Sequence, residues 1–227
     1  MIHFPLWHLV DSDISSPLRV TEQQPQPTSN RSFLHRLRNF LFQEDPTQPS
    51  DVIFVLAGRP ERKVYGLQLF QEGIAARLIL SVGRFEVRKM DRLGFQGLNL
   101  RELTSRLSPG ERHFFIDIVA DSQRVIVRSD AGKGTCAELM SLSRYLEPDR
   151  VNSLLLVSTS VHLGRVRHYC ERIASLSDKK ICYVPVPEDL SSFRKDGWWK
   201  HRNHWSYVLS ECAKLGISLL RPPKAIR

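Results

Sequence analysis

Cysteine is scarce in this sequence. Its 227 residues include four cysteines, and no two of them form a Cys-x-x-Cys pair, so the chain shows no zinc-finger or redox motif. Such isolated cysteines are typical of a reducing compartment, and we expect a cytoplasmic protein. Cys136 and Cys170 fall on expected core faces, where a free thiol behaves as a small hydrophobic side chain.

Long hydrophobic runs are also missing. The partly apolar start, Met1 to Val10, is interrupted by Pro5 and His8 and has no basic segment before it, which argues against a signal peptide or a membrane anchor. The 33 Lys and Arg against 24 Asp and Glu give a net charge of +9, which favours anionic partners. The basic residues form no dense block, so specific nucleic-acid binding is not expected.

Neither of the common glycine-rich phosphate motifs is present. The loop from Asp130 to Thr135 follows an expected strand and opens an expected helix, but it lacks Gly-x-x-x-x-Gly-Lys-Ser/Thr and Gly-x-Gly-x-x-Gly. Thr135 with Glu138 also fits a capping box, which would satisfy helix N–H groups. The loop is therefore either a phosphate cradle or a helix start.

Three segments differ in composition. Residues 1–32 form an expected flexible lead-in, because 11–32 are rich in Ser, Pro, Gln and Thr. Residues 33–50 contain a short basic amphipathic helix and a linker. Such a helix usually covers its own domain, and a peripheral contact with a membrane surface is the alternative. Residues 51–227 are long enough for one α/β domain.

Strand and helix patterns alternate in the third segment. Asp51–Gly58 predicts a buried strand, Pro60–Glu72 a helix that stops at Gly73, and Arg77–Gly83 a second strand, which together make a βαβ unit. The unbroken apolar run Leu154–Val157 predicts a strand buried on both faces. We therefore expect an α/β fold with a mostly parallel sheet and helices on both faces.

The remaining elements are less regular. Aromatic and basic residues interleave from Phe193 to Trp205; they either stack a base or a sugar or pack their own rings on the sheet. The other expected elements are two helices within 84–113, strands Phe114–Val119 and Arg124–Arg128 as a hairpin or with one at an edge, a helix with the stripe Cys136, Leu139, Leu142 and Leu146, an outer strand Ile181–Val186 because of Pro185, and a last helix Ser206–Leu215 ended by Gly216.

Polar side chains gather where strands end and helices begin. His162 lies in the first turn after the Leu154–Val157 strand, and Arg165 can reach the same opening. Ligands bind at this edge of open parallel sheets, where backbone N–H groups favour anions. Arg62 opposes the dipole of its helix, so it is either tolerated at the surface or holds an anion. The candidate ligand-binding residues are Gly58, Arg62, Ser81, Gly83, Thr135, Glu138, Ser158, Thr159 and Arg165, and His162 is the candidate catalytic residue.

Ordered segments between Asp51 and about Leu220 resemble the YdcF-like family. Ser158–Arg165 is similar to its Ser/Thr-Ser-x-x-His-x-x-Arg signature, and Ile79–Gly83 is similar to its Ile-x-Ser-Gly-Gly strand end, with Val82 in place of a glycine. The resemblance implies a Rossmann-like three-layer sandwich with a pocket at the carboxyl ends of the strands. It further implies S-adenosylmethionine as one candidate ligand and implies no particular reaction. The polar residues at the strand ends favour an anionic or nucleotide-like small molecule as ligand.

Two other functions stay open. The first is a phosphoester hydrolase or other transferase, in which His162 is a general acid or nucleophile and Arg62 and Arg165 hold phosphate; no carboxylate or metal cluster is evident nearby. The second is a non-catalytic basic module that binds nucleic acid or a membrane surface through Phe193–Trp205.

Overall fold

The computed structural model describes residues 41–42, 44–83, 86, 113–119, 122–127, 134–195 and 197–220, with 122–127 as backbone alone. The predictions for the lead-in, for the helix beginning at residue 33 and for the two helices within 84–113 therefore lie almost wholly outside the described residues. The fold that follows is that of the third segment.

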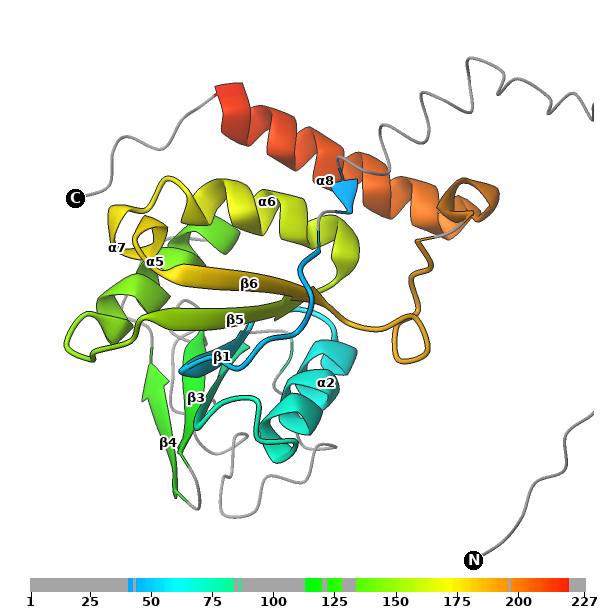
Figure 1. Ribbon diagram of the computed structural model, residues 1–227. Coiled ribbons are helices and arrows are strands. Elements are labelled where there is room, and N and C mark those ends of the chain that lie inside the picture. The colour runs from blue at the N-terminus through cyan, green and yellow to red at the C-terminus, as the bar shows by residue number, and fades with distance from the viewer. Residues whose placement is uncertain are drawn as a thin grey trace, which may run out of the picture.

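A six-stranded sheet with the order β4-β3-β2-β1-β5-β6 forms the centre of the protein (Figure 1). Its strands are β1 (Val52–Val55), β2 (Arg77–Val82), β3 (Phe114–Val119), β4 (Ser122–Val127), β5 (Ser153–Ser158) and β6 (Lys180–Pro185). Strands β2, β1, β5 and β6 are parallel neighbours, and β3 runs antiparallel to both β2 and β4. The expected α/β sandwich is confirmed, and the two irregular strands form a hairpin at one edge.

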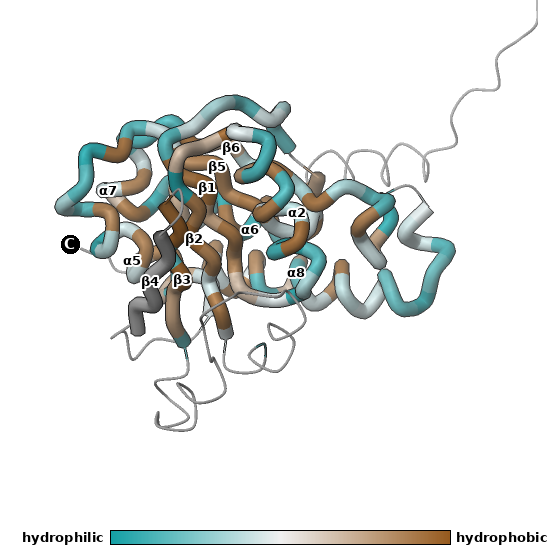
Figure 2. Tube along the Cα trace, turned by 90° about the horizontal axis from the view of Figure 1, so that it is seen from below, coloured by the Kyte–Doolittle hydropathy of each residue, from teal (hydrophilic) through white to brown (hydrophobic). Residues whose placement is uncertain are grey.

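Helices cover both faces of this sheet. They are α2 (Pro60–Gln71), α5 (Thr135–Leu146), α6 (Ser160–Cys170), α7 (Ala174–Ser177), a single turn η2 (Trp198–Lys200) and α8 (Arg202–Leu220). Because side chains alternate along a strand, Ile53 and Val55 of β1 pack with Leu69 of α2, whereas Phe54 and Leu56 pack in the cluster that holds α5 and α6. The central strands β1, β2 and β5 are accordingly strongly apolar in Figure 2.

The outer edge of β6 is covered by the segment before β1. The backbone N–H of Asp45 donates to Tyr183 O, and the Asp45 carboxylate accepts the Tyr183 N–H, both at 2.9 Å. Arg167 of α6 forms an ion pair with the same carboxylate at 3.0 Å. The expected linker thus blocks the free hydrogen-bonding edge that an outer strand would otherwise present.

Helix α8 differs most from its prediction, which was wrong at both ends. It spans Arg202–Leu220 and passes through Gly216 without a break. A glycine inside a helix costs only about 1 kcal/mol, and the buried Val208, Glu211 and Ser218 hold the helix against its neighbours. Figure 1 shows α8 lying on the side of α6 that faces away from the sheet.

Two packing predictions also need correction. Cys136 is only half-buried, while Leu139, Leu142 and Leu146 of the same stripe are fully buried. Phe193 and Trp198 do bury their rings, but in a small cluster with Leu41, Val161 and Val208 rather than on the sheet. Sequence periodicity could not show this, because the cluster exists only where α8 crosses α6. Within the described part of the chain, no helix combines the length and apolarity needed to cross a membrane.

Helix α2 approaches the sheet most closely at Gly66. A Cβ atom added there would lie 2.2 Å from Val55 Cγ2, well inside van der Waals contact. We predict that Gly66→Ala lowers the free energy of unfolding by about 1–3 kcal/mol, the usual cost of overpacking a core. The matched control is Gly216→Ala in α8, where an added Cβ meets nothing within 4 Å; it should raise stability by about 0.5–1 kcal/mol. Equal urea midpoints for Gly66→Ala and wild type would contradict this packing.

Candidate functional site

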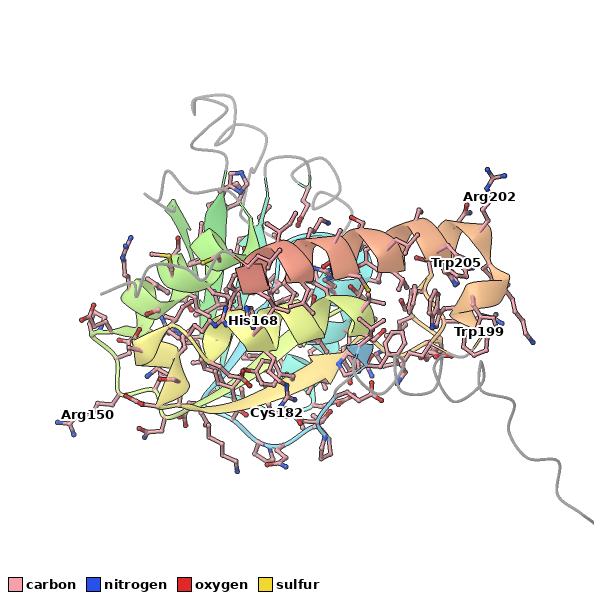
Figure 3. The ribbon with its side chains drawn as sticks, turned by 90° about the horizontal axis from the view of Figure 1, so that it is seen from above. Arg150, His168, Cys182, Trp199, Arg202 and Trp205 are labelled. Carbon is pink, nitrogen blue, oxygen red and sulfur yellow. The ribbon has the colours of Figure 1, made fainter. Side chains whose placement is uncertain are left out.

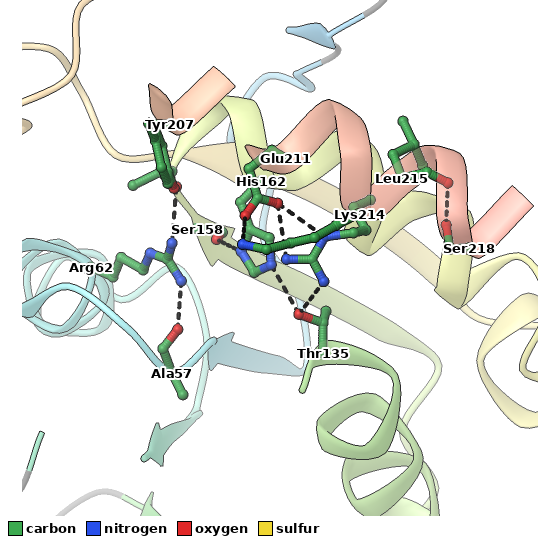
Figure 4. Close-up of polar contacts among 12 residues, drawn as sticks. Ala57, Arg62, Thr135, Ser158, His162, Tyr207, Glu211, Lys214, Leu215 and Ser218 are labelled. Carbon is green, nitrogen blue, oxygen red and sulfur yellow. Dashed lines mark hydrogen bonds and ion pairs between the residues drawn. The ribbon is translucent and has the colours of Figure 1, made fainter. Parts of the chain in front are cut away.

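Four segments that are distant in sequence meet at the carboxyl ends of β1 and β5 (Figure 4). Helices α2, α5 and α6 begin there, and α8 crosses above them. The parallel pairing of β1 with β5 places Val55 beside Val157, so the loops that follow both strands open on the same side. The polar side chains of this junction form what we call the strand-end cluster, whose members are Arg62, Thr135, Ser158, Thr159, His162, Arg165, Tyr207, Glu211 and Lys214.

His162 lies at the centre of the cluster and is almost completely buried. Its Nδ1 is 2.7 Å from Ser158 Oγ, and its Nε2 is 3.0 Å from Thr135 Oγ1. One ring nitrogen donates and the other accepts, as a neutral imidazole requires. Burial lowers the pKa of His162 well below its usual value, and the charges of Arg62 and Arg165 lower it further. The imidazole is therefore neutral at physiological pH.

Arg165 connects His162's partner on α5 to helix α8. Its Nη1 donates to Thr135 Oγ1 at 2.8 Å, while its Nε donates to Glu211 Oε2 at 2.9 Å. Lys214 donates to the other oxygen of Glu211 at 2.8 Å. Glu211 is thus held between two cations, and the buried side of α8 is polar where it meets the cluster.

Arg62 is the least satisfied member of the cluster. Only 4% of the residue is exposed. Its Nη1 donates to the backbone oxygen of Ala57 at 2.6 Å and its Nη2 to Thr159 Oγ1 at 2.9 Å. Its Nε has no hydrogen-bond partner, and none of its partners among the described residues is a carboxylate. This burial rules out the interpretation that Arg62 is tolerated at the surface.

Gly58 and Thr159 determine where Arg62 can lie. Gly58 has a φ of 135°, and a Cβ there would come within 2.8 Å of Arg62 Nη1, so only glycine fits beside the guanidinium. Thr159 precedes α6 but makes no side-chain cap of that helix. Its hydroxyl instead contacts Arg62 and, at 2.6 Å, the Tyr207 hydroxyl of α8.

The capping-box interpretation of Thr135 and Glu138 is wrong. The residue before α5 is Gly134, and no side chain caps the helix. Glu138 Oε1 instead accepts the backbone N–H of Ala57 at 2.7 Å. The next amide, Gly58 N–H, donates to Glu86. Two carboxylates therefore accept hydrogen bonds from the backbone N–H groups of the β1–α2 loop. The Thr135 hydroxyl instead contacts His162 and Arg165 of the strand-end cluster.

Glu86 also pairs with a lysine that the sequence analysis did not single out. Lys63 Nζ is 2.5 Å from Glu86 Oε2 and donates to Leu56 O at 3.2 Å. Burial lowers the pKa of Lys63 and raises the pKa of Glu86, and their mutual attraction opposes both shifts. This buried pair fixes the start of α2 against the end of β1.

Ser81 and Gly83 lie at the end of β2, outside the strand-end cluster. Ser81 is fully buried, and its hydroxyl has no partner. Gly83 is close to Glu86, whose Oε1 would be 3.3 Å from an added Cβ. The structure therefore brings together Arg62, Thr135, Ser158, Thr159, His162 and Arg165, joins Gly58 and Glu138 to them through the β1–α2 loop, and leaves Ser81 and Gly83 to one side.

Tyr207, Glu211 and Lys214 were missed from the sequence. Their spacing, with Ser218 one turn further on, puts polar residues on one face of α8, which is the signal that could have found them. As for metals, the described ranges contain no group of three or more His, Cys, Asp or Glu side chains that could hold an ion. The cluster's chemistry is that of hydrogen-bond donors and cations.

Compared with known proteins, the chain matches no family model, no curated protein sequence and no solved structure. A functional conclusion therefore has to come from the side chains of the cluster.

The neutral, buried His162 makes stability depend on pH. The pKa in the unfolded chain is near 6.5, and the folded value is lower, so the unfolded state takes up the proton first. The contribution of neutral His162 to the free energy of unfolding is fully present above pH 6.5. It is lost as the pH falls, by at most about 1.4 kcal/mol per pH unit for one proton.

The variant His162→Gln has a side-chain amide that can still donate and accept hydrogen bonds but does not titrate. We predict that its free energy of unfolding falls less steeply than that of the wild type between about pH 6.5 and pH 5. The exposed His201 provides the control variant His201→Gln, which should keep the wild-type slope. Denaturant titrations at several pH values measure both. If the free energy of unfolding of His162→Gln falls with pH as steeply as that of the wild type, His162 is not the buried neutral group.

Proposed function

We propose that the chain is a YdcF-like protein that binds an anionic, nucleotide-like small molecule at the strand-end cluster. The observation that carries the proposal is the buried guanidinium of Arg62, which has an unpartnered Nε and no carboxylate among its described partners. Leaving one buried charge without its counter-charge costs about 3–5 kcal/mol. An anionic ligand would supply the missing counter-charge at the carboxyl ends of the strands.

The charges around the strand ends also favour an anion. Four cations face three carboxylates, so the neighbourhood has a net charge of +1 with His162 neutral. The cations are Arg62, Lys63, Arg165 and Lys214, and the carboxylates are Glu86, Glu138 and Glu211. Arg62 bonds to no carboxylate among its described partners, whereas Lys63 pairs with Glu86, and Arg165 and Lys214 share Glu211.

Helix starts add to this preference. The N-termini of α2, α5 and α6 lie at the same edge of the sheet, and each carries partial positive charge on its free N–H groups. Arg62 and Arg165 both present planar forks, which suit phosphate or carboxylate oxygens. A phosphate group or a carboxylate is therefore the part of the ligand that the cluster would hold.

Catalysis by His162 is the weaker interpretation of the same residues. Both ring nitrogens are already bonded to hydroxyls, so a general acid or nucleophile role requires one of these bonds to break. The pairing of Ser158 with His162 resembles a nucleophile with its base, but Ser158 is 0% exposed and a substrate cannot reach it in this arrangement. Anion binding at Arg62 leaves both His162 hydrogen bonds in place and requires only that the guanidinium, which is 4% exposed, become accessible to the ligand.

The binding proposal predicts a specific pattern of thermal stabilisation. Inorganic phosphate, and separately S-adenosylmethionine as a nucleotide-like probe, should raise the unfolding temperature of the wild type, because a ligand that binds only the folded state stabilises it. Arg165→Ala should weaken binding of the effective probe by about 1.5–3 kcal/mol, the scale of a charge-assisted hydrogen bond. Arg62→Met should remove the response.

Arg150→Met is the matched control, because Arg150 projects from the surface after α5 (Figure 3) and should leave the response intact. Stabilisation that is equal in all three variants would place the anion elsewhere. No response to either probe or to related nucleotides would contradict the proposal.

A further inference from the structure

Helix α8 turns its apolar side outward. Leu209 and Ile217 are each 57% exposed, and Leu220 is 84% exposed. Trp205 and Leu219 are also exposed, so α8 carries five of the eight large apolar residues that are exposed in the described part of the chain. Its buried residues, in contrast, are Val208 and the polar Glu211 and Ser218. A surface helix normally buries its apolar face. The exposed apolar face of α8 therefore indicates a surface that a binding partner covers.

The exposed residues form one continuous stripe. The exposed Trp205, Leu209, Ala213 and Leu220, together with the half-buried Gly216, follow each other at intervals of three or four residues and therefore lie on one side of the helix. Ile217 widens the stripe by one position. At one end, Trp199, Arg202 and Trp205 gather at the margin of the molecule (Figure 3). Scattered exposed leucines need no explanation, but a stripe along a whole helix marks an interaction surface.

The charge around this stripe identifies the kind of partner. From Gly197 to Arg227 the sequence has six Lys and Arg residues and one acidic residue, Glu211. Glu211 is buried and pairs with Arg165 and with Lys214, which is one of the six, so it leaves the charges of the other five basic residues unbalanced. An apolar face with tryptophan and basic residues at its start, followed in the sequence by further basic residues after the helix, is the pattern of a helix that lies in a membrane interface.

We propose that α8 docks on an anionic lipid surface, with its apolar stripe buried among the headgroups and upper acyl chains. The helix lies along the outside of the protein (Figure 1) and is not apolar enough to cross a bilayer, so it rests on the membrane plane. A second copy of the chain is a poorer partner, because two like basic rims would repel each other. This surface is distinct from the strand-end cluster, which contacts the opposite side of α8.

Vesicle sedimentation with the full chain tests the proposal. The wild type should sediment with vesicles of phosphatidylcholine and phosphatidylglycerol, bind pure phosphatidylcholine weakly, and lose affinity as salt is raised. Leu209→Ser combined with Ile217→Ser should weaken binding to the anionic vesicles about tenfold or more, because two large apolar side chains no longer enter the lipid. Both positions are exposed, so the fold should survive, which circular dichroism checks.

The control is Val64→Ser with Leu190→Ser, which removes two exposed apolar side chains outside α8 and should leave vesicle binding unchanged. Brominated lipids should quench tryptophan fluorescence in the wild type and less so in Trp205→Phe. Vesicle binding that survives the α8 double variant overturns the proposal. A concentration-dependent dimer in ultracentrifugation that the same variant abolishes also overturns it, by showing that a second copy covers the stripe.

Discussion

Polar groups buried at the carboxyl ends of β1 and β5 must find their partners inside the protein. Both strands are covered on both faces, so the loops that leave them carry N–H groups, carbonyls and side chains into a region that helices close over. An unpaired polar group there costs free energy comparable to a lost hydrogen bond. The arrangement of α2, α5, α6 and α8 follows from this requirement.

Each helix supplies partners that the strand ends lack. Glu138 of α5 takes the N–H of Ala57, His162 of α6 takes the hydroxyl of Ser158, and α8 brings Tyr207 and Glu211 across the top. The inner side of helix α8 therefore carries Glu211 and Ser218 beside the apolar Val208, and five large apolar residues remain on the outer side. Two unusual features of the molecule remain outside this internal pairing: the Arg62 guanidinium, which has no carboxylate partner among the described residues, and the exposed apolar stripe.

The sheet was predictable because its signal is local. Leu154–Val157 is an apolar run of strand length, and the glycines at 58 and 73 mark where a strand and a helix end; the structure has β5, β1 and α2 at these places. Pro185 likewise placed β6 at an edge. These features depend on backbone chemistry and on burial within a single element, which composition and periodicity report directly.

The site was only partly predictable because its partners come from other elements. Thr135 and Glu138 fit a capping box by spacing, yet both bond across the fold, to His162 and to the loop after β1. The contribution of α8 was missed although the expected helix, Ser206–Leu215, contains Tyr207, Glu211 and Lys214, because these side chains acquire their role only by lying over α6. A local sequence pattern shows which residues are polar, but it does not show which side chains from other elements they contact.

The central claim is that the Arg62 guanidinium is kept for an anion. Native mass spectrometry of the full chain, purified without phosphate or sulfate and compared with its denatured mass, tests this most directly. We predict that the wild type carries an additional mass that is released on denaturation and identified as an anionic compound, and that Arg62→Met carries none. A bare wild-type mass that stays bare after incubation with phosphate and nucleotides would contradict the account.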